Sequence, residues 1–341
     1  MTTRRWLLLA GTASTALALA ASRARAQSWN DGLAHPIPYT PPPGKGKERA
    51  LVLGGGGVYL VSFMIGYFHA LKQGGVDLAT ADIVVGTSAG SIAGAVLSGG
   101  RLWRLSGELD IFGHFPRLFA ELVPALQANE SQERARRMAV QATNADPETI
   151  RAIGRAAMAA RNPANAESYA RTVQRVIGGG AWPSPKLHTT ANDCYTGERL
   201  VVSQSAGIPI ETACAASSSL PGSMGPTWLK DRLCMDGGIC PTSTHCDVVA
   251  GTRRALVISL SDGGPEAVAQ GLRTSGMPNT LAQEIRDLEA GGTKTMLVVA
   301  GLLPGMDRLD SIMDSQWIAP QLNYGHARGQ GDLAKVKAFW S

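Results

Sequence analysis

Past residue 26 the sequence lacks several features that would each indicate a class of protein. No apolar stretch approaches the roughly 20 residues that a bilayer span requires. No block of lysine and arginine occurs, and phosphate binding needs clustered basic side chains, so nucleic acid is not expected as a partner. There is also no G-K-[ST] sequence and no internal repeat. A membrane-spanning protein, a nucleic-acid-binding protein and a repeat protein are therefore not predicted.

Cysteine is scarce, and its placement is confined to one part of the chain. All five cysteines lie between Cys194 and Cys246, so at least one must stay unpaired within a monomer. A disulfide near Cys234, Cys240 and Cys246 and a set of free thiols are both compatible with this spacing. No C-x-x-C pair is present, and His245 beside Cys246 is the only mixed neighbour pair, so no metal site is expected.

The first 26 residues are predicted to be an export signal. Arg4 and Arg5 precede an apolar stretch that ends near Ala21, and Ala24-Arg25-Ala26 forms a small-x-small cleavage site. The paired arginines favour the twin-arginine route over an ordinary secretory signal or an uncleaved anchor. Cleavage would remove four arginines and no acid, which lowers the formal net charge from +5 to +1. The expected location is the periplasm or the extracellular space.

Residues 27–48 are rich in proline and glycine without a period, which predicts an extended lead-in before a single domain at 49–341. Short apolar runs at 50–53 and 83–85 alternate with helical patterns at 58–73 and 88–97. Strands joined by crossover helices pair in parallel within a covered sheet. The expected fold class is therefore α/β, with a mainly parallel central sheet flanked by helices.

Residues 101–178 have helical patterns without a strand signal, which predicts a helical insertion of about that extent. Strand patterns return in KLHTTAND and ERLVVS, a predicted hairpin around Thr196-Gly197, and again at 255–260 and 296–300. Two helical stretches are expected before Trp340. Apolar side chains of 101–125 could line a groove, although most are expected in the core: Leu102, Trp103, Phe112, Phe115, Leu118 and Phe119.

The stretch GTSAG places Ser88 between a predicted buried strand and a predicted helix, with Gly86 and Gly90 on either side. This is the pattern of a nucleophile elbow, in which a sharp turn needs neighbours without bulk and presents the serine hydroxyl at the carboxyl end of a strand. The alternative is a plain strand-to-helix turn in which Thr87 or Ser88 caps the helix.

Four glycines, Gly54, Gly55, Gly56 and Gly57, follow the first predicted strand. Such a loop exposes consecutive N–H groups that can approach a ligand closely. It lacks the third glycine of G-x-G-x-x-G and the ending of a P-loop, so a nucleotide site is disfavoured. The remaining interpretation is an oxyanion hole for a tetrahedral intermediate. A third stretch, Met235-Asp236-Gly237-Gly238, is by itself most easily read as a turn.

Taken together, these three stretches resemble the patatin-like phospholipase family, in its bacterial, exported form. LGGGG matches the oxyanion loop, GTSAG matches the nucleophile turn with Ser88, and DGG places Asp236 as the partner of a Ser-Asp dyad. WPSPKLHTTANDCYTGERLVV and AASSSLPGSMGP look like further family segments, so the resemblance runs from about residue 49 to the C-terminus.

The resemblance implies a three-layer α/β/α fold and a serine lipid acyl hydrolase of the phospholipase A or lysophospholipase type. It implies a lipid or other acyl ester as substrate, with transient contact to a membrane surface, and no cofactor; calcium has no support. An ordinary aspartate has a pKa of about 3.9 and is a poor base, so Asp236 must be partly desolvated. His245 is kept as an auxiliary candidate for a three-residue relay.

The sequence departs from the family pattern at two places. Tyr59 and Leu60 stand where the family has a small or basic residue and then a glycine, and Leu60 at positive φ would be strained by about 1 to 3 kcal/mol. Thr244-His245-Cys246-Asp247 replaces a usual segment after DGG. These departures motivate an alternative, a lipid-binding or accessory protein with weak or lost hydrolysis. A carboxylesterase for short soluble esters is a third interpretation.

Overall fold

The computed structural model describes residues 30–115 and 128–341. The predicted export signal and the groove candidates Leu118 and Phe119 lie outside the described residues. The chain divides into two compact units, Met1–Ala34 and His35–Ser341. The sheet, the helices around it and the candidate site all belong to the second unit.

The described strands of the second unit form one eight-stranded sheet in the order β5-β6-β3-β2-β1-β7-β8, with β4 paired to β3. The five strands β3, β2, β1, β7 and β8 run parallel, which confirms the predicted α/β class, and the hairpin predicted around Thr196-Gly197 is the antiparallel pair β3 and β4. The strands are β1 (Arg49–Leu53), β2 (Ile83–Gly86), β3 (Leu187–Asp193), β4 (Arg199–Ser203), β5 (Thr227–Leu229), β6 (Arg232–Asp236), β7 (Arg254–Ser259) and β8 (Lys294–Val299).

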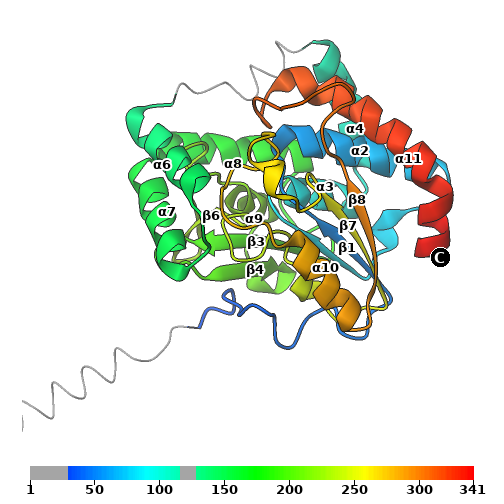
Figure 1. Ribbon diagram of the computed structural model, residues 1–341, viewed down its shortest axis with the longest axis horizontal. Helices are drawn as coiled ribbons and strands as arrows, with labels where there is room; N and C mark the ends of the chain where they lie inside the picture. Colours follow the sequence, from blue (N-terminus) through cyan, green and yellow to red (C-terminus); the bar gives the residue numbers. More distant parts are fainter. Residues whose placement is uncertain (1–29, 116–127) are drawn as a thin grey trace, which may run out of the picture. The chain divides into compact units, whose positions relative to one another are not determined.

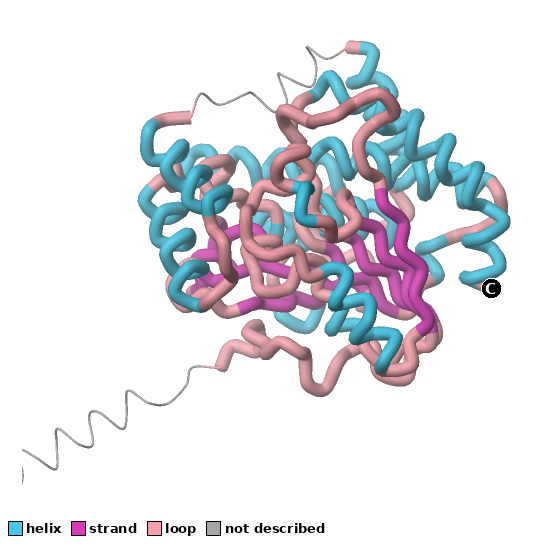
Figure 2. The backbone as a smooth tube through the Cα atoms, in the orientation of Figure 1, coloured by secondary structure: helices cyan, strands magenta, loops and turns pink. Residues whose placement is uncertain are grey.

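Helices flank this sheet, as the ribbon and the tube show (Figures 1 and 2). They are α2 (Gly57–Gln73), α3 (Ala89–Ser98), α4 (Leu102–His114), α6 (Glu130–Gln141), α7 (Pro147–Ala159), α8 (Pro163–Ile177), α9 (Ile210–Ser217), α10 (Leu281–Ala290) and α11 (Ile318–Trp340). The tail was expected to hold two helical stretches before Trp340, and the structure instead has one continuous helix, α11, there.

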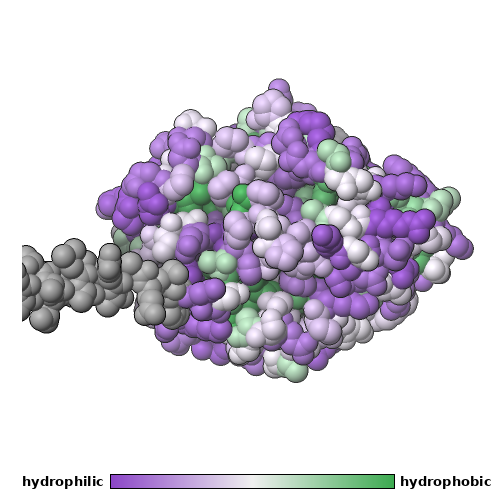
Figure 3. Space-filling view, turned by 90° about the horizontal axis from the view of Figure 1, so that it is seen from below, coloured by the Kyte–Doolittle hydropathy of each residue, from purple (hydrophilic) through white to green (hydrophobic). Residues whose placement is uncertain are grey.

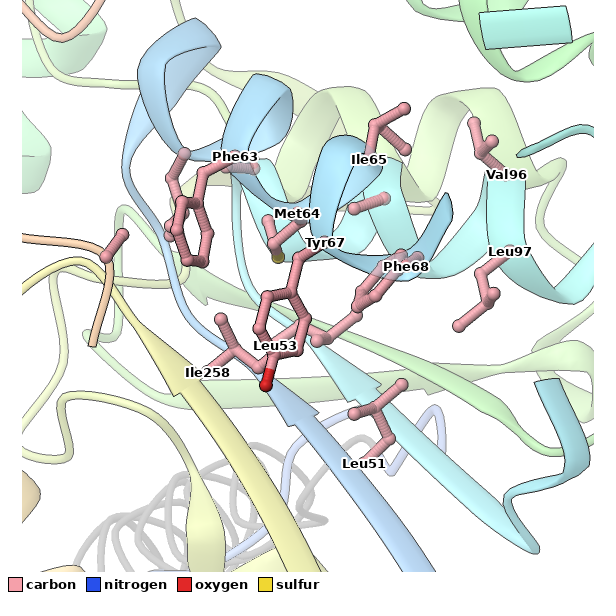
Figure 4. Close-up of a cluster of buried hydrophobic side chains, with 14 of the residues drawn as sticks. Leu51, Leu53, Phe63, Met64, Ile65, Tyr67, Phe68, Val96, Leu97 and Ile258 are labelled. Atoms are coloured by element: carbon pink, nitrogen blue, oxygen red, sulfur yellow. The ribbon is translucent and has the colours of Figure 1, made fainter. Parts of the chain in front are cut away.

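Two separate apolar cores cover the two faces of the sheet. Successive residues of a strand point to opposite faces, so Leu51 and Leu53 of β1 join one core and Ala50 and Val52 the other. The first core lies under α2, α3 and α11, and Figure 4 shows α2 side chains lying against the strands. The second core is covered by α10 and by the short 3-10 helix Cys246–Val249. The result is the three-layer arrangement that the sequence predicted.

Helices α6 and α7 pack against the antiparallel end of the sheet through a smaller cluster that includes Met235 of β6. The beginning of α6 is fixed by a capping box, because Asn129 accepts from the Gln132 N–H and the Gln132 side chain accepts from the Asn129 N–H. In Figure 1 these two helices lie side by side, away from α2 and α11.

Helix α11 lies along α2 at very close range. Glycines make this approach possible, because a Cβ at Gly66 would overlap the Leu322 carbonyl oxygen and a Cβ at Gly325 would overlap the Phe63 carbonyl oxygen. The Tyr67 hydroxyl also donates to Asp332 of α11 at 3.2 Å. Since the glycine loop leads directly into α2, the position of that loop depends on α11.

Within the described ranges, no helix is both long and apolar enough to cross a bilayer. The face drawn in Figure 3 is mainly hydrophilic, with hydrophobic residues in small separate areas. All five cysteines are buried free thiols, so the disulfide that the sequence allowed is not formed.

Candidate active site

The serine of the GTSAG stretch lies at a sharp bend between β2 and α3. Ser88 has φ 52° and ψ −118°, a conformation that residues with a side chain rarely adopt. Its hydroxyl makes no capping hydrogen bond to α3, although the residue occupies the N-cap position. The alternative of a plain helix cap therefore does not describe the Ser88 side chain.

Glycine is needed on both sides of Ser88 for steric reasons. A Cβ at Gly86 would lie 2.7 Å from the Ser91 Cα, and a Cβ at Gly90 would overlap the Leu53 carbonyl oxygen. The bend is thus packed directly against the end of β1. This explains why the pentapeptide has glycine at its two ends and why β1 and β2, paired in parallel, bring their following loops together.

The glycine loop contains one residue whose predicted role needs correction. Gly54 was expected to contribute its N–H to an oxyanion hole, but that N–H donates to the Ile258 carbonyl of β7 at 2.9 Å. The Gly54 carbonyl in turn accepts from the Gly90 N–H at 3.1 Å. Gly54 therefore extends the pairing of β1 with β7 and fixes the loop to the serine bend.

The next glycines face Ser88. A Cβ at Gly55 would lie 3.2 Å from the Ser88 Cβ, and no described residue accepts a hydrogen bond from the N–H of Gly55 or Gly56. Gly57 begins α2 with φ 58°, and a Cβ there would lie 2.6 Å from the Ile312 carbonyl oxygen. The loop thus presents bare amides beside the serine, at the N-terminal end of a helix, where developing negative charge is stabilised.

Asp236 ends β6 and is 2% exposed. Its Oδ1 accepts from the Gly238 N–H at 2.8 Å. Burial raises the pKa of this carboxyl to about 7, against the opposing effects of the Gly238 N–H and the nearby Ser88 hydroxyl. Oδ2 has no hydrogen-bond partner of normal geometry among the described residues, although the Ser88 hydroxyl is close enough to lower the pKa. The direction of this pKa shift is the one that the sequence required of a base.

One cavity connects these groups. Its lining includes Gly55, Gly56, Ser88, Asp236 and Gly238, and its volume, including its opening, is about 490 Å³. We call it the catalytic pocket. The serine, the acid and two of the four loop glycines, which are far apart in the sequence, therefore lie around a single space.

His245 does not face this pocket. Its ring is fully buried, and Nε2 donates to the Gly237 carbonyl oxygen at 2.9 Å. Burial lowers the pKa of His245 to about 4, so the ring is neutral near pH 7. The auxiliary role of His245 in a relay with Ser88 is therefore corrected: the ring supports the turn that follows Asp236.

The unusual segment 244–247 is anchored by a residue that the sequence did not single out. Glu284 of α10 accepts from the N–H groups of Thr244 and Cys246 and from the Thr244 hydroxyl. These hydrogen bonds keep the pKa of Glu284 below its usual value despite burial. A lone acid in an amphipathic helix carries no sequence signal for such a role, because the partner loop is far away in the chain.

Tyr59 and Leu60 follow the glycine loop, and Leu60 packs against it, because a Cβ at Gly56 would lie 2.6 Å from the Leu60 Cβ. Both are buried side chains of the first turn of α2, and Leu60 does not have positive φ; Gly57 does. The Tyr59 hydroxyl accepts from the Leu303 N–H at 3.0 Å, which holds it in the core. The strain expected for Leu60 at positive φ is therefore absent, because the helix begins before this residue.

A second cavity also reaches Ser88, and its lining is almost entirely apolar. It has a volume of about 850 Å³ including its opening. Its walls come from α2, α3, α4 and α8 and include Val61, Ile92, Leu105, Leu109, Phe112, Tyr169, Val173 and Val176. We call it the apolar cavity. Ser88 lines both this cavity and the catalytic pocket.

The predicted groove residues are only partly found in this wall. Phe112 lines the apolar cavity, Leu102 is in the core, and Trp103 and Phe115 are 54% and 61% exposed. The opposite wall, from α8, was not predicted, because the segment looks polar and alanine-rich. Tyr169 of α8 donates to the Ser218 hydroxyl at 2.8 Å, which fixes α8 beside the α9 segment.

A strained serine at a strand-to-helix bend, beside a buried carboxyl group and bare loop amides, is the arrangement of a serine hydrolase. The chain belongs to the patatin-like phospholipase family, whose model matches residues 51–244. The matched range contains the glycine loop, Ser88 and Asp236.

Solved structures that the chain is similar to include ExoU and VipD. The type III effector ExoU is 17% identical, with 86% of this chain and 54% of that chain covered at a TM-score of 0.33. The ExoU–SpcU complex from Pseudomonas aeruginosa is 18% identical, with 85% of this chain and 52% of that chain covered at a TM-score of 0.37. VipD from Legionella pneumophila is 13% identical, with 85% of this chain and 67% of that chain covered at a TM-score of 0.40. The chain spans about half the length of the ExoU chains. No curated protein matches it.

Proposed function

We propose that the protein is a serine lipid acyl hydrolase of the phospholipase A or lysophospholipase type that uses a Ser88–Asp236 dyad. The observation that carries the proposal is the catalytic pocket, where the Ser88 hydroxyl and a buried Asp236 with a pKa of about 7 line one space. A base whose pKa lies near the working pH is suited to accept a proton from a hydroxyl.

In the proposed reaction, Asp236 accepts the proton of Ser88 as Oγ attacks the ester carbonyl carbon. The carbonyl oxygen becomes an oxyanion that the N–H groups of Gly55 and Gly56 bind, each typically worth about 3 kcal/mol of barrier. The bond to the alcohol oxygen then breaks, and Asp236 returns the proton to the leaving alcohol. Water attacks the acyl-serine by the same route, releasing the fatty acid and restoring Ser88.

The apolar cavity is the proposed site of the fatty acyl chain. It begins at Ser88 and is bounded by aliphatic and aromatic side chains, so an acyl chain attached to the ester carbonyl can be buried there, away from water. Each buried methylene contributes roughly 0.8 kcal/mol. The pattern of residues 1–26 supports export to the periplasm or beyond, and a lipid substrate implies transient contact with a membrane surface.

Covalent labelling tests the nucleophile directly. A fluorophosphonate ester is expected to label the wild-type protein at Ser88, because the reagent needs an activated hydroxyl beside oxyanion donors. The measurement is mass spectrometry of the labelled peptide, with Ser88→Ala as the negative control. Absence of labelling at Ser88 would favour the lipid-binding or accessory alternative.

Acyl-chain preference tests the apolar cavity. With a series of nitrophenyl esters, kcat/KM is expected to rise toward long acyl chains. Leu109→Phe, on the cavity wall, should lower kcat/KM for the longest esters roughly tenfold, equivalent to about two buried methylenes. Ile111→Phe is the matched control, because Ile111 is on the same helix, is 52% exposed and does not line the cavity. A maximum at the shortest esters would instead indicate a general carboxylesterase.

A further inference from the structure

A third cavity, with a volume of about 1070 Å³ including its opening, shares lining residues with the catalytic pocket. Three arginines from separate segments line it: Arg136 of α6, Arg273 of the loop before α10, and Arg308 of the loop before α11. We call it the arginine pocket. Arg273 and Thr274 line both this pocket and the catalytic pocket, so the two spaces are contiguous beside Ser88.

The charges around the arginine pocket do not cancel. Arg136 is paired with Glu133 at 2.9 Å, and Asp310 is the only acid among the described residues that line the pocket. Neither Arg273 nor Arg308 forms an ion pair with any residue in 30–115 or 128–341. The pocket therefore has an excess of positive charge.

Arg273 is the arginine nearest the chemistry, and it is half-buried. One guanidinium nitrogen donates to the Met277 carbonyl oxygen at 2.9 Å. Glu284 interacts with Arg273 only through its charge, because its carboxylate oxygens accept hydrogen bonds from the backbone N–H groups of residues 243, 244 and 246. Partial burial of a guanidinium costs free energy when no carboxylate pairs with it, and a bound anion that accepts its hydrogen bonds would offset this cost. Thr274 and Ser275, which follow in the lining, add hydroxyl groups to the same wall.

We propose that the arginine pocket binds the phosphate group of a phospholipid substrate, with Arg273 as the specificity-determining residue. The inference rests on the proposed function: the ester carbonyl lies at Ser88, the acyl chain enters the apolar cavity, and the head group reaches Arg273, which lines the catalytic pocket together with Ser88. A guanidinium presents parallel N–H donors that match phosphate oxygens. The preferred substrates are therefore acyl esters with a phosphate close to the ester, in preference to neutral glycerides.

A binding experiment tests this independently of turnover. Ser88→Ala protein is titrated calorimetrically with 1-O-hexadecylglycerol and with 1-O-hexadecylglycerol 3-phosphate, each below its critical micelle concentration. Both are ether lipids that cannot be hydrolysed, and they differ only in the phosphate. The phosphate lipid should bind roughly 10- to 100-fold more tightly, which is the affinity gain expected from hydrogen bonds to a charged group. Equal affinities would overturn the proposal.

Three variants in the Ser88→Ala background locate the effect. Arg273→Gln should remove most of the preference for phosphate, and Arg308→Gln, at an exposed position that tolerates substitution, should reduce it. Arg286→Gln is the matched control, because Arg286 is exposed on α10 and bonded to Gln283. A preference that persists in both Arg273→Gln and Arg308→Gln contradicts the assignment. Sodium phosphate that binds as tightly as the phosphate lipid would make the pocket a free-phosphate site and likewise overturn it.

Turnover distinguishes failure of this inference from failure of the proposed function. In a background with Ser88 intact, Arg273→Gln should lower the ratio of kcat/KM for a lysophospholipid to kcat/KM for a nitrophenyl ester by roughly tenfold or more. Arg286→Gln should leave the ratio unchanged. If wild-type protein hydrolyses neither ester, the proposed hydrolase fails, while the ether-lipid comparison still decides whether the pocket binds phosphate. An unchanged ratio in an active Arg273→Gln enzyme rejects the inference alone.

Discussion

Ser88→Ala is expected to lower kcat for ester hydrolysis by at least about 10³-fold, as loss of the nucleophile does in serine hydrolases. The remaining rate would come from oxyanion binding and substrate positioning, because Gly55 and Gly56 are unchanged. The measurement is kcat with a long-chain nitrophenyl ester. Folding should be preserved, since the Ser88 hydroxyl makes no capping hydrogen bond and alanine is smaller.

Ser98→Ala provides the matched control for this variant. Ser98 is the last residue of α3, the same helix that Ser88 precedes, and it lines neither the catalytic pocket nor the apolar cavity. Its kcat should equal that of the wild-type protein. Retention of most ester turnover in Ser88→Ala, with an unaltered melting temperature, would remove Ser88 from the reaction.

Asp236→Asn is expected to lower kcat/KM by about 10³-fold, because the amide cannot accept the Ser88 proton. For the wild-type protein, kcat/KM should rise with pH through about 7, the pKa of Asp236, because only the carboxylate is a base. At pH 5 the rate should be roughly 100-fold below its plateau. The pH profile of the Asn variant should lack this rise. A rise that survives in Asp236→Asn would assign it to another group.

The same substitution should stabilise the fold at high pH. Burial raises the pKa of Asp236 from 3.8 to about 7, so between these values the folded protein holds a proton that the unfolded chain releases. Stability therefore falls as pH rises through this window, by up to about 4 kcal/mol once pH exceeds 7. Asp236→Asn should melt at a higher temperature than wild type at pH 8, with a difference that shrinks toward pH 4. Equal melting temperatures at pH 8 would contradict the buried carboxylate.

Features that follow from local pattern could be predicted from the sequence. The runs at 50–53 and 83–85 are short, apolar and ended by glycine, and both are parallel strands at the centre of the sheet. Because parallel strands end at one edge, the glycine loop and Ser88 had to meet there. Asp236 was placed by resemblance, since DGG alone is most often a turn.

Features that depend on partners distant in the chain could not be predicted. The role of Gly54 depends on its register with Ile258 of β7, which adds one hydrogen bond beyond the strand. Glu284 accepts from backbone groups about 40 residues earlier in the chain, and such side-chain-to-backbone contacts leave no pattern in a single sequence. The α8 wall of the apolar cavity was missed because its apolar residues, Val173 and Val176, are separated by polar ones.

The family match ends at residue 244, but the glycine contacts between α2 and α11 show that the position of the candidate site also depends on residues after it. A methyl group at Gly325 would push α11 away from α2, and the displacement would reach the amides at the N-terminal end of α2. No side chain lies between the two backbones at this contact. A shift of α11 is therefore not accommodated by a change of side-chain rotamer and moves α2 as well. The close packing of α11 on α2 therefore helps to hold the glycine loop beside Ser88.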